Sequence, residues 1–192
     1  MSSSDAEKWN AKYRTGDHDR IEPARVLSDY SHLLPRQGRA LDLACGTGAN
    51  ALFLARQGLK ASAWDISAEA ISVLRARATE NNLNLECQVC DVTDTVIPAQ
   101  SFEVITVSYF LDRTLFPGII NALNINGLLF YQTWIREHSS DRGPHNENFR
   151  LGANELLHLC RDLHIVLYLE EGLAGDLKHG LRDEAMLIGQ RR

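Results

Sequence analysis

"LDLACGTGAN" occupies residues 41–50, where an apolar run with one aspartate is followed directly by Gly46, Thr47 and Gly48. When such a turn links a strand to a helix, backbone N–H groups and the positive end of the helix meet a ligand. Glycine is needed there because a side chain would occupy the space of the ligand. The stretch therefore predicts a nucleotide-binding turn, and the rest of the chain must indicate which nucleotide it holds.

Predicted strands and helices alternate along most of the chain. Apolar or alternating stretches predict strands at 40–44, 59–65, 85–91, 102–110, 128–134, 164–171 and 184–190. Apolar stripes at helical spacing predict helices at 4–14, 23–34, 48–58, 67–82, 114–123 and 152–163. Strand–helix alternation implies a parallel sheet covered on both faces. The last two strands lack a helix between them, which predicts a hairpin and one antiparallel strand.

The composition is that of an ordinary globular domain. The 192 residues carry a formal net charge of −5, and 44% are hydrophobic. That is enough chain for one domain with a full core, and the charge argues against a nucleic-acid surface. No stretch has the features of a signal peptide or approaches the ~18 apolar residues of a membrane helix. We therefore expect one cytoplasmic domain that binds neither nucleic acid nor a membrane.

Four cysteines are present, and Cys87 and Cys90 form a C-x-x-C pair. The pair lies in the predicted strand 85–91, where residues three apart point to opposite faces and cannot share a metal. We expect these to be buried structural thiols and expect no metal site.

Two nucleotide motifs fit the turn. Gly46, Gly48 and Ala51 satisfy the dinucleotide pattern G-x-G-x-x-A, which would suit an NAD-dependent oxidoreductase. Alternatively, Asp42 begins an acidic-x-Gly-x-Gly-x-Gly loop with Ala44 at its first glycine position. An acid inside the strand is unfavourable beside a pyrophosphate but suits a cationic sulfonium ligand that also carries an ammonium group. The sign of the charge favours S-adenosylmethionine.

With Asp42, Ala44, Gly46 and Gly48 in this loop, the chain resembles the class I S-adenosylmethionine-dependent methyltransferases. It is most similar to their tellurite-resistance, TehB-like branch, which is related to the thiopurine methyltransferases. The likeness is carried by "LACGTGANALFLARQG", "AWDIS", "NGLLFYQTW" and "EAMLIGQRR". The resemblance implies a Rossmann-like, seven-stranded mixed α/β sheet in the order 3-2-1-4-5-7-6, with strand 7 antiparallel and helices on both faces.

The same resemblance implies roles for residues at the strand ends. Asp65, 23 residues after Asp42, would accept both ribose hydroxyls, a feature shared with NAD enzymes. Asp91 would bind the adenine amino group while Ile66 and Val92 enclose the ring. Ser108 would contact the methionine part of the donor. The expected cofactor-binding residues are Asp42, Ala44, Gly46, Gly48, Asp65, Ile66, Asp91, Val92 and Ser108.

The N-terminal segment "KWNAKYRTG" looks like the Trp- and Tyr-bearing lid helix of small-molecule methyltransferases. We therefore expect residues 1–35 to form N-terminal lid or cap helices and residues 36–192 to form the Rossmann-like core of a single domain 1–192. Trp9 and Tyr13 are candidates to cover the cofactor, and simple core contacts are the alternative for both.

The acceptor side offers several candidates. Strand 4 ends in "VSYFLDR" and lacks the Asn/Asp-Pro-Pro-aromatic motif that resembles a signature of amino-group methylation. Tyr109 lies where family members meet the acceptor, and nearby Arg113 is suited to steady an anion. The long irregular segment 135–156 is a further candidate to line the site. It contains His138, Arg142, His145 and Arg150, while His179 and Arg182 follow in a poorly matching region.

The sequence thus predicts methyl transfer from S-adenosylmethionine to a small, soft or anionic acceptor of the thiol, selenium or tellurium oxyanion type. The product cofactor would be S-adenosylhomocysteine. Methyl transfer is an in-line displacement, so an anionic nucleophile needs mainly alignment, whereas a neutral one needs a base. The catalytic residue stays open among Tyr109, Arg113 and His145. Alternatives are O- or N-methylation of another metabolite, a non-catalytic S-adenosylmethionine-binding module, or an NAD-dependent enzyme; a monomer or homodimer is expected.

Overall fold

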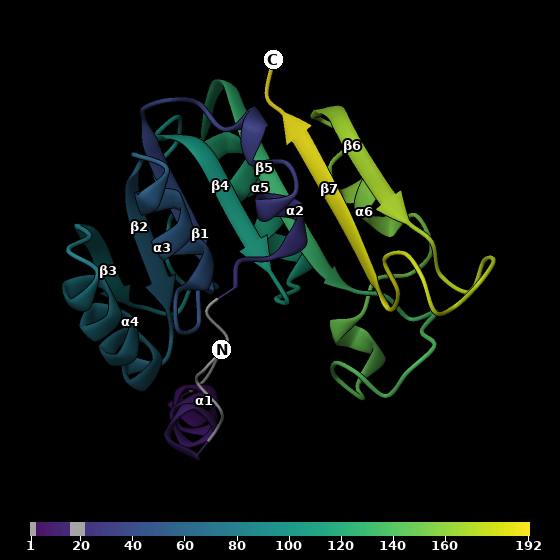
Figure 1. Ribbon diagram of the computed structural model, residues 1–192, viewed down its shortest axis with the longest axis horizontal. Coiled ribbons are helices and arrows are strands. Elements are labelled where there is room, and N and C mark those ends of the chain that lie inside the picture. Colours follow the sequence, from purple (N-terminus) through teal and green to yellow (C-terminus); the bar gives the residue numbers. More distant parts are fainter. Residues whose placement is uncertain (1–2, 16–21) are drawn as a thin grey trace.

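The computed structural model describes residues 3–15 and 22–192, whose central element is a seven-stranded sheet (Figure 1). Its strands are β1 (Arg39–Leu43), β2 (Lys60–Asp65), β3 (Leu85–Val89), β4 (Phe102–Ser108), β5 (Leu123–Trp134), β6 (His164–Glu170) and β7 (Glu184–Gln190). The sheet order is β3-β2-β1-β4-β5-β7-β6, with β1 to β5 parallel. Strand β7 runs antiparallel to both β5 and β6. The predicted order and the antiparallel seventh strand are confirmed.

Helices cover the two faces of this sheet (Figure 1). On one face lie α2 (Arg25–Ser28), α3 (Ala49–Arg56) and α4 (Ala68–Glu80). On the other lie α5 (Phe116–Ala122) and α6 (Glu155–Leu159). Because side chains of a strand alternate between faces, Ala40 packs beneath α2 and α3 while its neighbour Leu41 joins the opposite core cluster.

Helix α1 (Ser3–Thr15) lies apart from the sheet and packs against α4 (Figure 1). The Oδ1 atom of Asn10 accepts a hydrogen bond of 2.7 Å from the Ser67 hydroxyl, and Arg14 forms an ion pair of 2.8 Å with Glu69. The predicted helix over 4–14 is confirmed, whereas Gly16 and the start of the following loop lie outside the described residues.

Several predicted boundaries are wrong. The expected helix over 23–34 is only one α-helical turn, α2, followed by the 3-10 helix η1 (Ser31–Leu33), because the backbone leaves the helical conformation at Tyr30 (φ −115°, ψ 25°). The expected helix over 152–163 shrinks to α6, since Asn154 is left-handed at φ 58°. A further short 3-10 helix, η2 (Arg113–Leu115), precedes α5.

The strands also differ from expectation. Strand β5 begins at Leu123, five residues early, because the chain passes directly from α5 into the strand and the register shifts next to β4. Strand β3 ends at Val89, so Cys90 and Asp91 lie in the following loop. Cys87 and Cys90 are only partly buried, because β3 is an edge strand. Within the described residues, no helix is long and apolar enough to cross a membrane.

Candidate functional site

The turn between β1 and α3 is left-handed at three alternate residues. The backbone angle φ is 54° at Ala44, 54° at Gly46 and 80° at Gly48. A Cβ atom on Gly46 would lie 2.7 Å from the hydroxyl oxygen of Tyr13, and one on Gly48 would collide with Leu74. Glycine is therefore required at both positions, whereas Ala44 carries a methyl group in this conformation at a cost of about 1–2 kcal/mol.

Asp42 lies within β1 and only 1% of its surface is exposed. Its Oδ2 atom accepts a hydrogen bond of 3.0 Å from the backbone N–H of Ala51, and its Oδ1 atom accepts one of 3.4 Å from the Asn50 amide. Burial raises the pKa of Asp42 to about 7, although these two hydrogen bonds oppose the shift. In this arrangement Asp42 ties β1 to the first turn of α3 and acts on the site through Asn50.

Asp65 ends β2 directly beside the glycine turn. Its Oδ2 atom accepts a hydrogen bond of 2.7 Å from the backbone N–H of Gly46, and its Oδ1 atom accepts one of 2.8 Å from that of Ser67. Burial raises the pKa of this carboxyl group. Gly46 and Asp65, which the family resemblance assigned to one cofactor, are thus in direct contact.

The third acid follows β3. Asp91 accepts hydrogen bonds from the backbone N–H and the hydroxyl of Thr93, at 2.9 Å and 2.7 Å. The backbone N–H of Cys90 donates to the Asp65 carbonyl at 2.9 Å, which holds this loop against the end of β2. Ile66 is partly exposed, whereas Val92 is packed into the larger core cluster and only 4% exposed. The three acids therefore lie at three neighbouring strands, β1, β2 and β3.

Asn50 connects these acids to β4 and was missed in the sequence. Its amide nitrogen donates to Ser108 at 3.1 Å as well as to Asp42, and its Oδ1 atom accepts the backbone N–H of Ala24 at 2.9 Å. A buried asparagine in the first turn of a helix that follows a glycine turn is the signal that could have found it.

A second cluster of polar side chains lies at the same edge of the sheet, on β4, β5 and β7. The Tyr109 hydroxyl donates to Glu184 Oε2 at 3.1 Å, and the Gln132 amide nitrogen donates to the same oxygen at 2.5 Å and to the Tyr109 oxygen at 3.2 Å. Arg142 binds Glu184 Oε1 at 2.9 Å, and its guanidinium lies 5.2 Å from the centre of the Trp134 ring. Of these, the sequence singled out only Tyr109 and Arg142.

Arg113 does not fit the role of an anion-binding residue in this structure. Its guanidinium forms a two-pronged ion pair with Glu155, at 2.6 Å and 3.0 Å, and donates to the backbone carbonyl of Asn148 at 2.7 Å. The hydrogen bonds with Glu155 raise the pKa of Arg113. Arg113 therefore fastens the loop after β5 to α6.

Of the remaining candidates from the loops, the arginines hold the backbone of their loops and the histidines are exposed. Arg150 is 3% exposed and donates to the backbone carbonyls of Ile135, Arg142 and Pro144, so it holds the 136–150 loop in shape. Arg182 does the same for the loop before β7 through the carbonyls of Gly172, Asp176 and His179. His145 is exposed, and exposed His179 pairs with Asp176.

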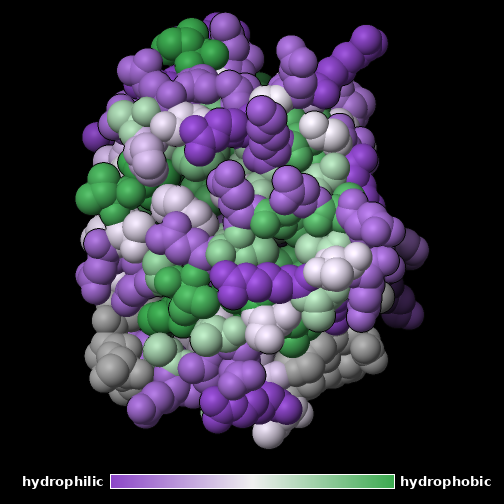
Figure 2. All heavy atoms as spheres, turned by 90° about the vertical axis from the view of Figure 1, so that its left-hand side faces the viewer, coloured by the Kyte–Doolittle hydropathy of each residue, from purple (hydrophilic) through white to green (hydrophobic). Residues whose placement is uncertain are grey.

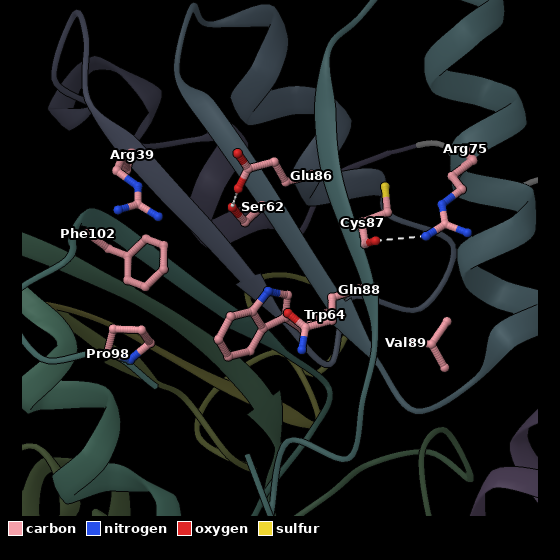
Figure 3. Close-up of a pocket in the computed structure, with 10 residues that line it drawn as sticks. All are labelled: Arg39, Ser62, Trp64, Arg75, Glu86, Cys87, Gln88, Val89, Pro98 and Phe102. Atoms are coloured by element: carbon pink, nitrogen blue, oxygen red, sulfur yellow. Dashed lines mark hydrogen bonds between the residues drawn. The ribbon is translucent and has the colours of Figure 1, made fainter. Parts of the chain in front are cut away.

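A surface cavity of about 560 Å³ lies elsewhere, on the sheet face at β2 and β3 (Figure 3). Trp64 and Phe102 contribute apolar walls, and Arg39, Arg75 and Glu86 contribute charges. Figure 2 views the molecule from the side of β3 and α4, where apolar and polar side chains are intermixed on the surface. The cavity exists because the connection from β3 to β4 contains no helix to cover this face. The acids and the glycine turn lie instead at the carboxyl ends of the strands, where ligands bind open α/β sheets.

Residues 40–124 match a family model described as a methyltransferase domain. The chain is 30% identical over 173 residues to a probable S-adenosyl-L-methionine-dependent methyltransferase, TehB, of Haemophilus influenzae, a match that covers 86% of this chain and 56% of that protein. It is 29% identical over 131 residues to a ubiquinone biosynthesis O-methyltransferase of Xanthomonas axonopodis pv. citri, covering 65% of this chain and 55% of that protein.

The crystal structure of TehB from Haemophilus influenzae superposes with a TM-score of 0.71 at 21% identity, covering 97% of this chain and 67% of that one. The chain thus spans just over half the length of the curated relatives it matches.

Proposed function

Since this chain belongs to the class I S-adenosylmethionine-dependent methyltransferases, we propose that it transfers a methyl group from S-adenosylmethionine to a small acceptor with a soft nucleophile, leaving S-adenosylhomocysteine. The observation that best supports a donor site is the hydrogen bond of 2.7 Å from the Gly46 N–H to the Asp65 carboxylate. This contact brings the acid expected to bind the ribose next to a turn that admits no side chain, which supports a donor site at this point of the sheet.

The described residues fit such a donor. A Cβ atom on Gly46 or Gly48 would collide with Tyr13 or Leu74, so glycine keeps this turn tight beside Asp65, while Asp91 supplies a second carboxylate in the loop after β3. Asp42, through Asn50, adds negative charge on the side where the donor carries its ammonium and sulfonium groups. When bound, the donor supplies an already activated methyl group, so the residues of this chain have mainly to align the acceptor with it.

Among soft acceptors we place thiols ahead of selenium and tellurium oxyanions. Arg113 and Arg142, the arginines expected near the acceptor, are each paired with a glutamate. An oxyanion would have to compete with those carboxylates. The TehB relative supports a soft acceptor in general, while O-methylation is the second candidate because the Xanthomonas relative is named an O-methyltransferase and Tyr109 can act as a base.

Calorimetric titration with S-adenosylmethionine, S-adenosylhomocysteine and NADH tests the donor site. We expect both sulfur nucleotides to bind and the Asp65→Ala variant to bind them roughly 30- to 1000-fold more weakly, because two charge-assisted hydrogen bonds are worth about 2–4 kcal/mol together. Asp94→Ala, which removes an exposed acid close to Asp91, is the matched control and should bind normally. Unchanged affinity in Asp65→Ala would remove Asp65 from the site.

Turnover separates an enzyme from a binding module. Wild-type protein with methyl-labelled donor should label at least one small thiol or hydroxyl compound. Donor binding without any labelled product would favour the non-catalytic module, and binding of NADH alone would contradict the proposal altogether.

A further inference from the structure

Glu184 is a buried carboxylate at the strand edge where an acceptor is expected. It begins β7 and is 3% exposed. The antiparallel register sets Glu184 opposite Trp134, and the β4–β5 register sets Ser108 opposite Gln132. These residues therefore share one edge of the sheet, and Ser108 is tied through Asn50 to Asp42. A buried charge requires partners, and the partners of Glu184 lead directly to Tyr109.

The hydrogen bonds around Tyr109 define which way its proton points. Gln132 Oε1 accepts the backbone N–H of Val26 at 2.8 Å, which only an oxygen can do. The Gln132 nitrogen must then face Tyr109 and Glu184, and it donates to both. Because an ionised carboxylate only accepts, the Tyr109 proton lies on the Glu184 side. Toward a ligand, the phenolic oxygen of Tyr109 can act only as a hydrogen-bond acceptor.

The backbone conformation of Tyr109 also indicates a functional role for this residue. Tyr109 has φ of 58°, a left-handed conformation that costs an aromatic residue about 1–2 kcal/mol. Its N–H donates to the Gln132 carbonyl at 2.8 Å, and its ring lies 5.1 Å from that of Trp134. Strain of this kind is typical of functional sites, where surrounding contacts hold a side chain in place.

We propose that Tyr109 takes the proton of the methyl acceptor and passes its own proton to Glu184, so that the site is built for acceptors that arrive as neutral thiols or hydroxyls. This inference rests on the proposed function and specifies its acceptor class. As the nucleophile forms its bond to the methyl carbon, the bond between that carbon and the donor sulfur breaks and its electron pair stays on sulfur. The acceptor proton moves to the Tyr109 oxygen, the Tyr109 proton moves to Glu184 Oε2, and charge is conserved because one cation and one carboxylate are neutralised together.

Arg142 has a positioning role in this scheme. Its guanidinium binds Glu184 Oε1 at 2.9 Å and lies over the Trp134 ring, so it fixes the position of the carboxylate whose other oxygen binds Tyr109. Because Arg142 is paired with Glu184, its positive charge is already engaged and offers little extra attraction to an anionic acceptor.

Two thiol probes test the proton transfer. At neutral pH 2-mercaptoethanol is largely a neutral thiol, whereas 4-nitrothiophenol is a thiolate that has no proton to lose. Loss of a general base typically lowers kcat by about 100-fold or more. We expect Tyr109→Phe and Glu184→Gln to show such a loss with 2-mercaptoethanol and less than about a threefold loss with 4-nitrothiophenol. Glu184→Asp should recover part of the activity with the neutral thiol.

Matched controls come from β6, where the Tyr168 hydroxyl donates to Glu170. Tyr168→Phe and Glu170→Gln remove the same chemical groups and should leave both rates unchanged. Circular dichroism checks that each variant folds. If Glu184→Gln does not fold, the rates of Tyr109→Phe with the two thiols decide the test, because this substitution changes no charged group.

Three outcomes would overturn the inference: an equal loss with both thiols, methylation of selenite but of neither thiol, or no methylation of either thiol by wild-type protein that binds S-adenosylmethionine. A different result would contradict the proposed function itself, namely the absence of S-adenosylmethionine binding in the calorimetric titration.

Discussion

Asp42 and Asp65 are both nearly enclosed, but they differ in what they contact. The carboxylate oxygens of Asp42 accept hydrogen bonds from Asn50 and Ala51, both near the start of α3, and so hold this helix against β1. Asp65 contacts the turn itself at Gly46. A single pattern, an acid near the end of a parallel strand, therefore serves two purposes. Their hydrogen-bond partners distinguish the two, because Asp42 binds the first turn of α3 whereas Asp65 binds the N–H of Gly46 in the turn itself.

Asp42 should make stability depend on pH. Its pKa is about 7 in the folded chain against an ordinary value of 3.8, so the folded state binds the extra proton. Its stabilising contribution is complete below about pH 4 and is lost as the pH rises through about 7, at up to about 1.4 kcal/mol per pH unit. Urea unfolding at about pH 5, 6 and 7 gives the slope of the free energy of unfolding against pH. In Asp42→Asn the part of this slope that comes from Asp42 should be lost. Asp94→Asn should keep it, and an identical slope in Asp42→Asn would contradict the assignment.

Helix α1 is the element whose position relates most directly to the proposed donor site. Its hydrogen bonds run to the start of α4, and Tyr13 faces Gly46 across the glycine turn. Burial, with a smaller effect from the charge of Asp65, raises the pKa of Tyr13. None of the described α1 residues belongs to the three core clusters. The helix thus packs against α4 and beside the glycine turn without being part of the core that stabilises the sheet.

Deleting residues 1–16 should therefore weaken S-adenosylmethionine binding while the remaining chain still unfolds cooperatively. We expect roughly a tenfold loss of affinity, the equivalent of about 1.4 kcal/mol. Asn10→Ala removes the contacts to Ser67 and Glu69 and should weaken binding by less. Calorimetry measures the affinities and urea unfolding measures cooperativity. A truncated protein that binds the donor normally would refute the lid.

At the scale of the molecule, the sheet order determines where a ligand can bind. The strands proceed outward in one direction from β1 to β3 and in the other from β4 to β6, so the crevice lies between β1 and β4. Asn50 and Gln132 each accept an N–H from the segment that enters α2, at Ala24 and Val26. Residues 24–26 are thereby fastened to both α3 and β5, and so connect the proposed donor side with the proposed acceptor side.

Ligand binding should stabilise the whole fold. At a hundred times its dissociation constant, S-adenosylhomocysteine should raise the free energy of unfolding by about 2.7 kcal/mol. The same concentration should stabilise Asp65→Ala by far less, and NADH should leave both proteins unchanged. Thermal or urea unfolding with and without each nucleotide measures the difference. Equal stabilisation by NADH would mean that the turn selects for something other than the sulfur nucleotide.

The sequence by itself determined the features that depend on local order along the chain. Alternation of apolar residues placed the strands, and Gly46 and Gly48 placed the turn, whereas the interest in Asp65 and Asp91 came from the family resemblance. The strand order, which the structure confirms, was expected from the resemblance to class I methyltransferases and not from any local pattern.

Only the tertiary structure decided which side chains meet. Tyr109 and Glu184 are separated by 75 residues, and Arg113 and Glu155 by 42, yet each pair is in contact. No local pattern distinguishes an arginine that awaits an anion from one already paired with a glutamate. That difference depends on strand register and loop packing, which bring distant residues together after the sheet has formed.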